Sequence, residues 1–229
     1  MMADQLNEHH LTVQRTARYY VLGEPTEKTR NIWFCLHGFG QLAQYFSRKF
    51  ADIANDETLV VVPEGLSRLY LNGEYKRVGA SWLTHEDRDY EVADFVAYLN
   101  TLYDTTLGSR PAQDFHITLF GFSQGAATAC RWLSDGHIRA DRLMLWAGFF
   151  ANGMADLIDP KKLTGVETHY VYGSEDEFLT LIPDPATYLN RIRQEIQGIQ
   201  ITEYEGEHRV EPAVLQTLLT TKSAYPSPD

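Results

Sequence analysis

Short, mostly apolar runs alternate along this chain with longer segments of helical periodicity, and this alternation constrains the fold most strongly. A short apolar run is typical of a strand whose two faces are both covered, as in a parallel sheet. Strands separated by helices form right-handed βαβ units. The sequence therefore predicts a doubly wound α/β fold, with helices on both faces of a mostly parallel sheet. The expected buried strands are 32–36, 58–62, 115–120, 143–146, 168–171 and 199–204.

The intervening segments have apolar residues at the spacing of amphipathic helices. In the clearest of them, 92–103, apolar side chains recur every three or four residues, and this helix is expected to begin near Asp89. Alternation of polar and apolar residues at 12–22 predicts an exposed edge strand. The segment 64–88 has no clear periodicity, and long loops of this kind often belong to functional sites. Further helices are expected at 42–53, 124–133, 188–196 and 214–219, with Pro212 in the first turn of the last.

Length, composition and charge restrict the class of protein. The 229 residues and 44% hydrophobic content favour one globular domain over 1–229, ending in a loose tail at 224–229. The net charge of −11 would repel nucleic acids and anionic lipid surfaces, so neither is an expected partner. The longest strongly apolar stretch, 143–151, is less than half of the roughly 20 residues that a transmembrane helix needs. No stable membrane insertion is therefore expected.

The two cysteines and the N-terminal residues bear on the compartment. Residues 1–10 lack the apolar core of a secretory signal. Cys35 and Cys130 lie in apolar segments, which favours buried thiols in a reducing compartment. We therefore expect a cytoplasmic location, although the sequence leaves a disulfide between the two cysteines open.

A Gly-x-Ser-x-Gly sequence lies between the predicted strand 115–120 and the helix that follows it. Its serine is Ser123, with Gly121 and Gly125 two residues to either side. A serine between a strand and a helix has the setting of a nucleophile elbow, where any side chain at the two flanking positions would collide. The plain alternative is a glycine-bounded turn in which Ser123 caps the helix.

A general base and an acid for this serine follow later in the chain. A serine hydroxyl attacks well only when a base removes its proton, and the base needs a carboxylate to orient it. Asp176 and His208 each follow a predicted strand, in the order serine, acid, histidine expected of this fold. Glu175 and Glu177 flank Asp176 and stay open as alternative acids. His85 is the one serious alternative base, but it precedes the serine.

Acyl transfer also requires hydrogen-bond donors for the developing oxyanion. The backbone N–H of Gln124, at the start of the helix after the serine, is one candidate. The other is the N–H of Phe39, in a loop after the first buried strand where Gly38 and Gly40 allow an amide to point inward. His37, in the same loop, is expected to orient the loop and not to react.

These elements together resemble the phospholipase/carboxylesterase family of α/β-hydrolases, which includes acyl-protein thioesterases. The resemblance extends from about Asn31 to the last predicted helix and implies an α/β-hydrolase fold with no large cap domain. It also implies Ser123 as nucleophile, Asp176 as acid and His208 as base, with the oxyanion held by the two backbone amides named above. The motifs that carry it are Leu36-His37-Gly38-Phe39-Gly40 and Gly121-Phe122-Ser123-Gln124-Gly125, followed by Asp176 and His208.

The same resemblance suggests where an acyl chain would bind. Ser81-Trp82 is similar to a Ser-Trp that the family carries beside its acyl pocket, so Trp82 is a candidate lining residue, with a buried core aromatic as the alternative. Phe149 is a second candidate. It lies in the run Trp146-Ala147-Gly148-Phe149-Phe150, which departs from the family pattern and leaves the acyl-chain preference open.

The sequence therefore predicts a serine hydrolase that cleaves small-molecule carboxylic esters through an acyl-enzyme, as a carboxylesterase or lysophospholipase does. No phosphate-binding, dinucleotide-binding or metal-binding motif occurs, so we expect no cofactor and no metal. Two alternatives remain: a thioesterase that uses the same residues, and a non-catalytic binding protein with the same fold. Homo-oligomerisation and the physiological substrate are left open.

Overall fold

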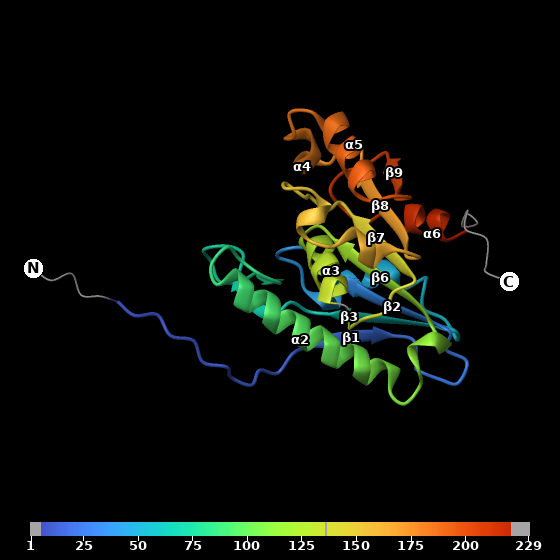
Figure 1. The fold of residues 1–229 in the computed structure, drawn as a ribbon. Helices are drawn as coiled ribbons and strands as arrows, with labels where there is room; N and C mark the ends of the chain where they lie inside the picture. Colours follow the sequence, from blue (N-terminus) through green and yellow to red (C-terminus); the bar gives the residue numbers. More distant parts are fainter. Residues whose placement is uncertain (1–5, 136, 221–229) are drawn as a thin grey trace, which may run out of the picture.

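The computed structural model describes residues 6–135 and 137–220, and within them a seven-stranded sheet forms the centre of the molecule (Figure 1). Its strand order is β1-β3-β2-β6-β7-β8-β9. Only β1 is antiparallel to its neighbour, and the other strands are parallel. This confirms the predicted doubly wound α/β fold. The strands are β1 (Tyr19–Leu22), β2 (Asn31–Leu36), β3 (Thr58–Pro63), β6 (His116–Phe122), β7 (Arg142–Trp146), β8 (Glu167–Gly173) and β9 (Gln200–Tyr204).

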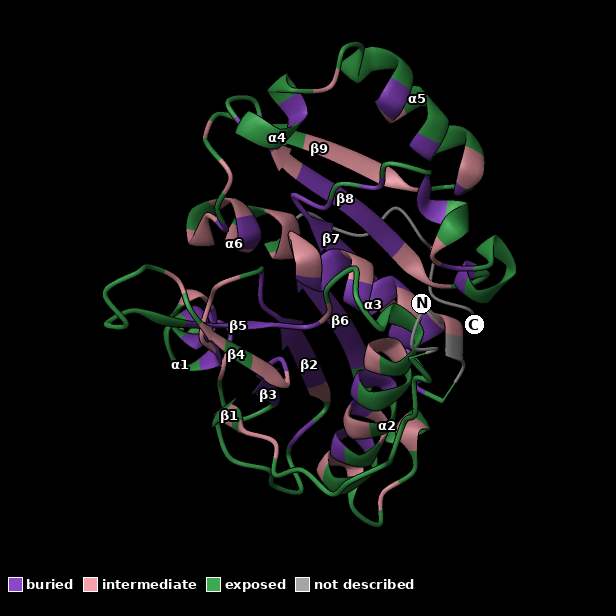
Figure 2. Cartoon of the chain, turned by 90° about the vertical axis from the view of Figure 1, so that its left-hand side faces the viewer, coloured by how far each residue is buried: buried purple, intermediate pink, exposed green. Residues whose placement is uncertain are grey.

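The sheet separates two hydrophobic cores, and Figure 2 shows its buried strands between helices on either side. On one face, apolar side chains of the sheet pack against α2 (Arg88–Leu107), α3 (Gln124–Asp135) and α5 (Pro185–Glu195). On the other face they pack against α1 (Ala43–Phe46), the 3-10 turn η1 (Ser47–Phe50) and α6 (Pro212–Thr220). Successive side chains of a strand point to opposite faces, so burial on both faces requires the continuous apolar runs seen in the sequence.

The two cysteines lie in different cores. Cys35 belongs to the core under α1 and α6, and Cys130 to the core under α2 and α3. Both are free and buried, as the sequence predicted, and the sheet between them prevents a disulfide. Burial raises the pKa of Cys130 to about 12 and that of Cys35 well above its usual value, so both thiols stay protonated and unreactive.

Two predicted elements are shorter in the structure than in the sequence analysis. Of the edge strand expected at 12–22, only Tyr19–Leu22 pairs with β3, and the preceding described residues form no strand. The helix expected at 42–53 is one turn of α-helix followed by the 3-10 turn η1. Phe46, Phe50 and Ile53 are nonetheless buried. Apolar spacing thus identified the buried face of this segment but not its hydrogen-bonding pattern.

The segment 64–88 contains a β-hairpin that the sequence analysis did not predict. Its strands are β4 (Ser67–Tyr70) and β5 (Val78–Ser81), which pair antiparallel. Asn72-Gly73, a dipeptide typical of hairpin turns, lies in the connection and could have indicated it. The remaining short elements are η2 (Ala112–Asp114), η3 (Met154–Asp156), η4 (Pro160–Leu163) and α4 (Glu177–Thr180).

Among the described residues, no helix combines the length with the apolar character that crossing a membrane requires. The tail expected at 224–229 lies outside the described residues. The parallel strands end on one edge of the sheet, where the loops after β2, β6, β7, β8 and β9 converge. The candidate site is built from these loops.

Candidate active site

Ser123 lies in a tight turn between β6 and α3, with a backbone φ of +54° that side-chain-bearing residues rarely adopt. Its backbone N–H donates to the carbonyl oxygen of Trp146 (2.8 Å). A Cβ added to Gly121 would lie 2.3 Å from the backbone oxygen of Gly125, and one added to Gly125 would lie 2.3 Å from that of Leu36. Both glycines are therefore required by the close approach of backbone, as the spacing of the motif predicted.

The imidazole of His208 lies between the serine and a carboxylate. Its Nε2 is 2.9 Å from Oγ of Ser123, and its Nδ1 is 2.8 Å from Oδ2 of Asp176. With the Nδ1 proton donated to the carboxylate, Nε2 is free to accept the serine proton. The structure thus brings together the three side chains selected from sequence, from loops after β6, β8 and β9. His85 is exposed and makes no hydrogen bond with Ser123 in the described structure.

The carboxylate beside His208 belongs to Asp176 and to neither flanking glutamate. Asp176 is 1% exposed, whereas Glu175 and Glu177 are both exposed. Its second oxygen, Oδ1, accepts the backbone N–H of Phe178 (3.0 Å) and caps the short helix α4. This cap holds the carboxylate in place beside the imidazole.

The two amides considered for an oxyanion hole lie on either side of Ser123. Gln124 follows it directly in the chain, and a Cβ added to Gly38 would lie 3.2 Å from Cβ of Ser123, so the Phe39 loop packs against the serine. Within the described residues, neither the Phe39 nor the Gln124 N–H donates to a protein acceptor. Gly40 has φ +74° and its N–H donates to Ala80 (2.8 Å), which holds the loop against the hairpin.

The side chain of Gln124 has a function in the structure that the sequence analysis missed. Its Oε1 accepts the backbone N–H of Trp82 (3.0 Å), and its Nε2 donates to the carbonyl of Leu83 (2.8 Å). These bonds connect the first turn of α3 with the segment after the hairpin, over 40 residues earlier. No local signal in the sequence reports such a contact, because the partners meet only in the folded chain.

His37 orients the Phe39 loop through both of its ring nitrogens. Its Nδ1 donates to the carbonyl of Gly38 (2.8 Å), and its Nε2 accepts the N–H of Gly65 (2.9 Å). The indole N–H of Trp82 donates to the His37 carbonyl (2.8 Å). Full burial lowers the pKa of His37 to about 4, so the ring is neutral at pH 7. With both nitrogens occupied, His37 has no free position from which to act as a base.

Because His37 is buried in its neutral form, the protein should become less stable as the pH is lowered. Unfolded histidine takes up a proton near pH 6.5, whereas folded His37 resists protonation until about pH 4. As the pH falls from about 6.5 to about 4, the free energy of unfolding should therefore decrease by up to about 3 kcal/mol. Below about pH 4 this histidine should have no further effect on stability. Urea titrations across this range would measure it. A His37→Gln variant should lack this part of the slope, and equal slopes in the two proteins would contradict the assignment.

A buried carboxylate, Glu64, directly precedes Gly65, the residue whose N–H binds His37. It accepts hydrogen bonds from Arg18 (2.7 Å), Arg68 (2.8 Å) and the backbone N–H of Ala43 (3.1 Å). Burial acts to raise the pKa of Glu64, but the two guanidinium groups and the amide outweigh it and lower that pKa. The network ties the start of β1, the hairpin and the first turn of α1 together. The network has no local signature in the sequence, since its members are distant in the chain.

The two aromatic residues considered for an acyl site have different surroundings. Trp82 is 2% exposed and its indole lies 5.0 Å from the ring of His37, as expected of a buried core aromatic. Phe149 is 50% exposed and stacks on Tyr188. It follows Gly148, where an added Cβ would lie 2.7 Å from that of Ala126 in the first turn of α3. Phe149 is therefore near the elbow and accessible.

A family profile described as Phospholipase/Carboxylesterase matches residues 18–222. No curated protein sequence matches the chain. Among solved structures, acyl-protein thioesterase 2 of Zea mays is similar with a TM-score of 0.65 at 16% identity, over 89% of this chain and 96% of that one.

Two further structures have the same arrangement. Esterase PE8 gives a TM-score of 0.54 at 18% identity, over 89% of this chain and 96% of its own. The protein TT1662 from Thermus thermophilus gives 0.58 at 16% identity, over 90% and 96%. At these identities the likeness establishes the α/β-hydrolase fold and leaves the reaction to be argued from the site.

Proposed function

Because this chain belongs to the phospholipase/carboxylesterase family, we propose that it is a serine hydrolase that cleaves small-molecule carboxylic esters. The family and the neighbouring structures support an esterase or thioesterase activity of the α/β-hydrolase type. The observation that carries the finer proposal is the His208 ring, which lies within hydrogen-bond distance of both Ser123 and Asp176. A histidine with a purely structural role would need its contact with Asp176 but would not need a serine with strained backbone dihedrals beside its Nε2.

In the proposed acylation step, Nε2 of His208 removes the proton of the Ser123 hydroxyl as Oγ attacks the ester carbonyl. The carbonyl oxygen becomes an oxyanion and accepts hydrogen bonds from the backbone N–H groups of Phe39 and Gln124. When the carbon–oxygen bond to the alcohol breaks, His208 returns the proton to the leaving oxygen. Asp176 stabilises the imidazolium between these transfers and remains ionised itself.

Deacylation repeats these steps with water. His208 accepts a proton from a water molecule, whose oxygen attacks the acyl-serine carbonyl to form a second oxyanion at the same two amides. Collapse releases the carboxylic acid, and His208 returns the proton to Ser123. The residues named supply every proton acceptor and donor that this sequence needs, so the mechanism uses no cofactor and no metal.

A thioesterase is the second candidate, because thioesters pass through the same tetrahedral intermediate. The names of two similar structures, the Zea mays acyl-protein thioesterase and a thioesterase domain from a curacin biosynthetic pathway, favour testing it. Neither the elbow nor the two amides distinguish an oxygen from a sulfur leaving group. The preference between esters and thioesters therefore has to be measured.

The test is a series of p-nitrophenyl esters from acetate to palmitate, beside thioesters of the same acyl groups. We expect saturable hydrolysis and labelling of Ser123, located by mass spectrometry, by a fluorophosphonate. Labelling with hydrolysis of thioesters alone would support the second candidate. Neither labelling nor hydrolysis of any ester would contradict both and support a non-catalytic binding protein of this fold.

For the acyl site, we propose that Phe149 contacts the substrate chain and that Trp82 supports the loop behind it. Phe149→Ala should then lower kcat/KM for the longest esters about tenfold and leave acetate unchanged, because only a long chain reaches the lost apolar surface. Trp82→Ala should instead lower the free energy of unfolding by roughly 3–5 kcal/mol, measured by urea denaturation. Equal effects of Phe149→Ala on acetate and palmitate would show that Phe149 does not select chain length.

We extend the proposal to a single-domain enzyme in a reducing compartment such as the cytoplasm, which the two free buried thiols support. Oxidising conditions should leave the protein without a disulfide, since the sheet lies between the two thiols. Fractionation of the producing cell with an antibody against the chain would test the location.

A further inference from the structure

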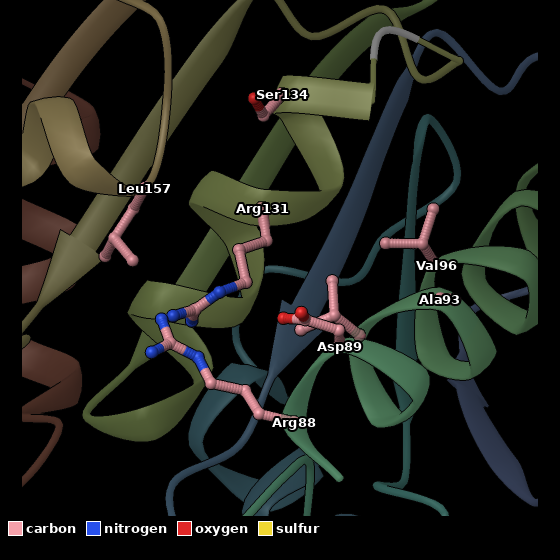
Figure 3. A pocket seen from close by; sticks show the side chains of 8 residues that line it. Arg88, Asp89, Ala93, Val96, Arg131, Ser134 and Leu157 are labelled. Carbon is pink, nitrogen blue, oxygen red and sulfur yellow. The ribbon is translucent and has the colours of Figure 1, made fainter. Parts of the chain in front are cut away.

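A second candidate binding site has none of Ser123, Asp176 and His208 in its lining. A cavity of about 450 Å³ opens between the first turns of α2 and the later turns of α3, with Leu157 on its third side (Figure 3). Its size falls within the range of small-molecule sites. We propose that this cavity binds an organic carboxylate with a short apolar chain.

The basic groups of the cavity are two neighbouring arginines. Arg88 and Arg131 extend from α2 and α3, and their guanidinium groups meet at one side of the cavity (Figure 3). Burial and the nearby charge of Arg88 both lower the pKa of Arg131, and Arg88 acts on it more strongly than Asp156 does. Neither arginine is held in an ion pair in the described structure, and the like charge of Arg88 outweighs Asp156 at Arg131, so an added anion would relieve the repulsion between the two guanidinium groups.

The remaining lining residues define the shape and charge of that anion. Asp89 also lines the cavity and Asp156 acts on Arg131 from beside it, so two carboxylates partly offset the two arginines. Their negative charge repels a phosphate dianion more strongly than a monoanionic carboxylate. A carboxylate also matches the planar fork of a guanidinium, with two parallel hydrogen bonds. Val92, Val96 and Leu157 add an apolar wall that a short hydrocarbon chain would cover.

The proposed site is separate from the catalytic residues in the fold. Arg131 is seven residues after Gln124 on α3, a rise of roughly 10 Å along the helix. The acid released by ester hydrolysis has the same chemistry as the proposed ligand, so product could occupy this site. Binding itself does not depend on the hydrolase proposal, because it can be measured without turnover.

The experiment is an NMR titration of the full chain with hexanoate and, as a neutral isostere, hexanamide. Hexanoate should bind and hexanamide should bind at least tenfold more weakly, because only the anion forms charge-assisted bonds. Arg131→Gln should weaken hexanoate binding about tenfold for the same reason. Asp89→Asn should strengthen it about threefold, since it removes a like charge from the ligand's surroundings.

Arg193→Gln is the matched control, because it removes the same charge from the exposed surface of α5. It should leave the affinity within about twofold of that of the original chain. The opposite effects expected of Arg131→Gln and Asp89→Asn separate a local site from a loss of folding, which would weaken binding in both variants. No binding of hexanoate, or binding that neither variant alters, would overturn the proposal. Failure of the hydrolase proposal would appear instead as absent turnover with binding intact.

Discussion

Replacing Ser123 by alanine should lower kcat for ester hydrolysis by roughly 10⁶-fold, to the residual rate that substrate binding and the two backbone amides supply. The size of the effect follows from the role proposed for Oγ: without it no acyl-enzyme forms, and His208 has no serine proton to accept. Steady-state hydrolysis of a p-nitrophenyl ester by both proteins would measure it. Fluorophosphonate labelling should disappear in the same variant.

The Ser123→Ala variant should fold normally, so a loss of activity can be assigned to the missing hydroxyl. Alanine at φ +54° carries the same Cβ strain as serine, and the N–H bond to Trp146 involves only backbone. Unchanged thermal unfolding beside lost turnover would therefore assign the loss to the hydroxyl. Activity within tenfold of the original would show that another group is the nucleophile.

Asp176→Asn should lower kcat by roughly 10⁴-fold, because an amide can no longer fix the His208 tautomer or balance the imidazolium. Asparagine is as good a helix cap as aspartate, so the α4 cap should persist and the effect should be confined to the reaction. Hydrolysis rates near neutral pH would measure the change.

Glu175→Gln and Glu177→Gln are the matched controls for this carboxylate. Each removes one negative charge within one residue of Asp176, yet both side chains are exposed. We expect each to change kcat by less than about twofold, as for solvent-screened charges. If kcat fell strongly in either glutamine variant while Asp176→Asn stayed active, that glutamate would be the catalytic acid.

The buried strands were predictable because a parallel strand covered on both faces leaves a distinctive apolar run. β2, β3 and β7 began within one residue of their expected starts. The helix expected at 42–53 was too long for a different reason. Apolar residues at intervals of three and four suit both an α-helix and a 3-10 turn, so their spacing identified a buried face and not a hydrogen-bonding pattern.

Ser123, Asp176 and His208, which the structure brings together, could be selected from the sequence because each follows a strand in a set order. The supporting contacts could not. Glu64 meets Arg18 across 46 residues, and Gln124 meets Trp82 across 42, so neither has a local pattern. The hairpin of β4 and β5 had a usable signal in Asn72-Gly73, but its long polar connection obscured the alternation on either side.

The order of the strands also determines which local unfolding event takes the catalytic side chains apart. Ser123 and Asp176 follow β6 and β8 inside the sheet, whereas His208 follows β9, which pairs on one side only. Edge elements open at lower free energy than the interior. A fluctuation that detached β9 would separate His208 from a serine 85 residues away while the rest of the sheet stayed folded. Catalytic competence thus depends on the pairing of an edge strand, and a refolding chain acquires it only when β9 has joined the sheet.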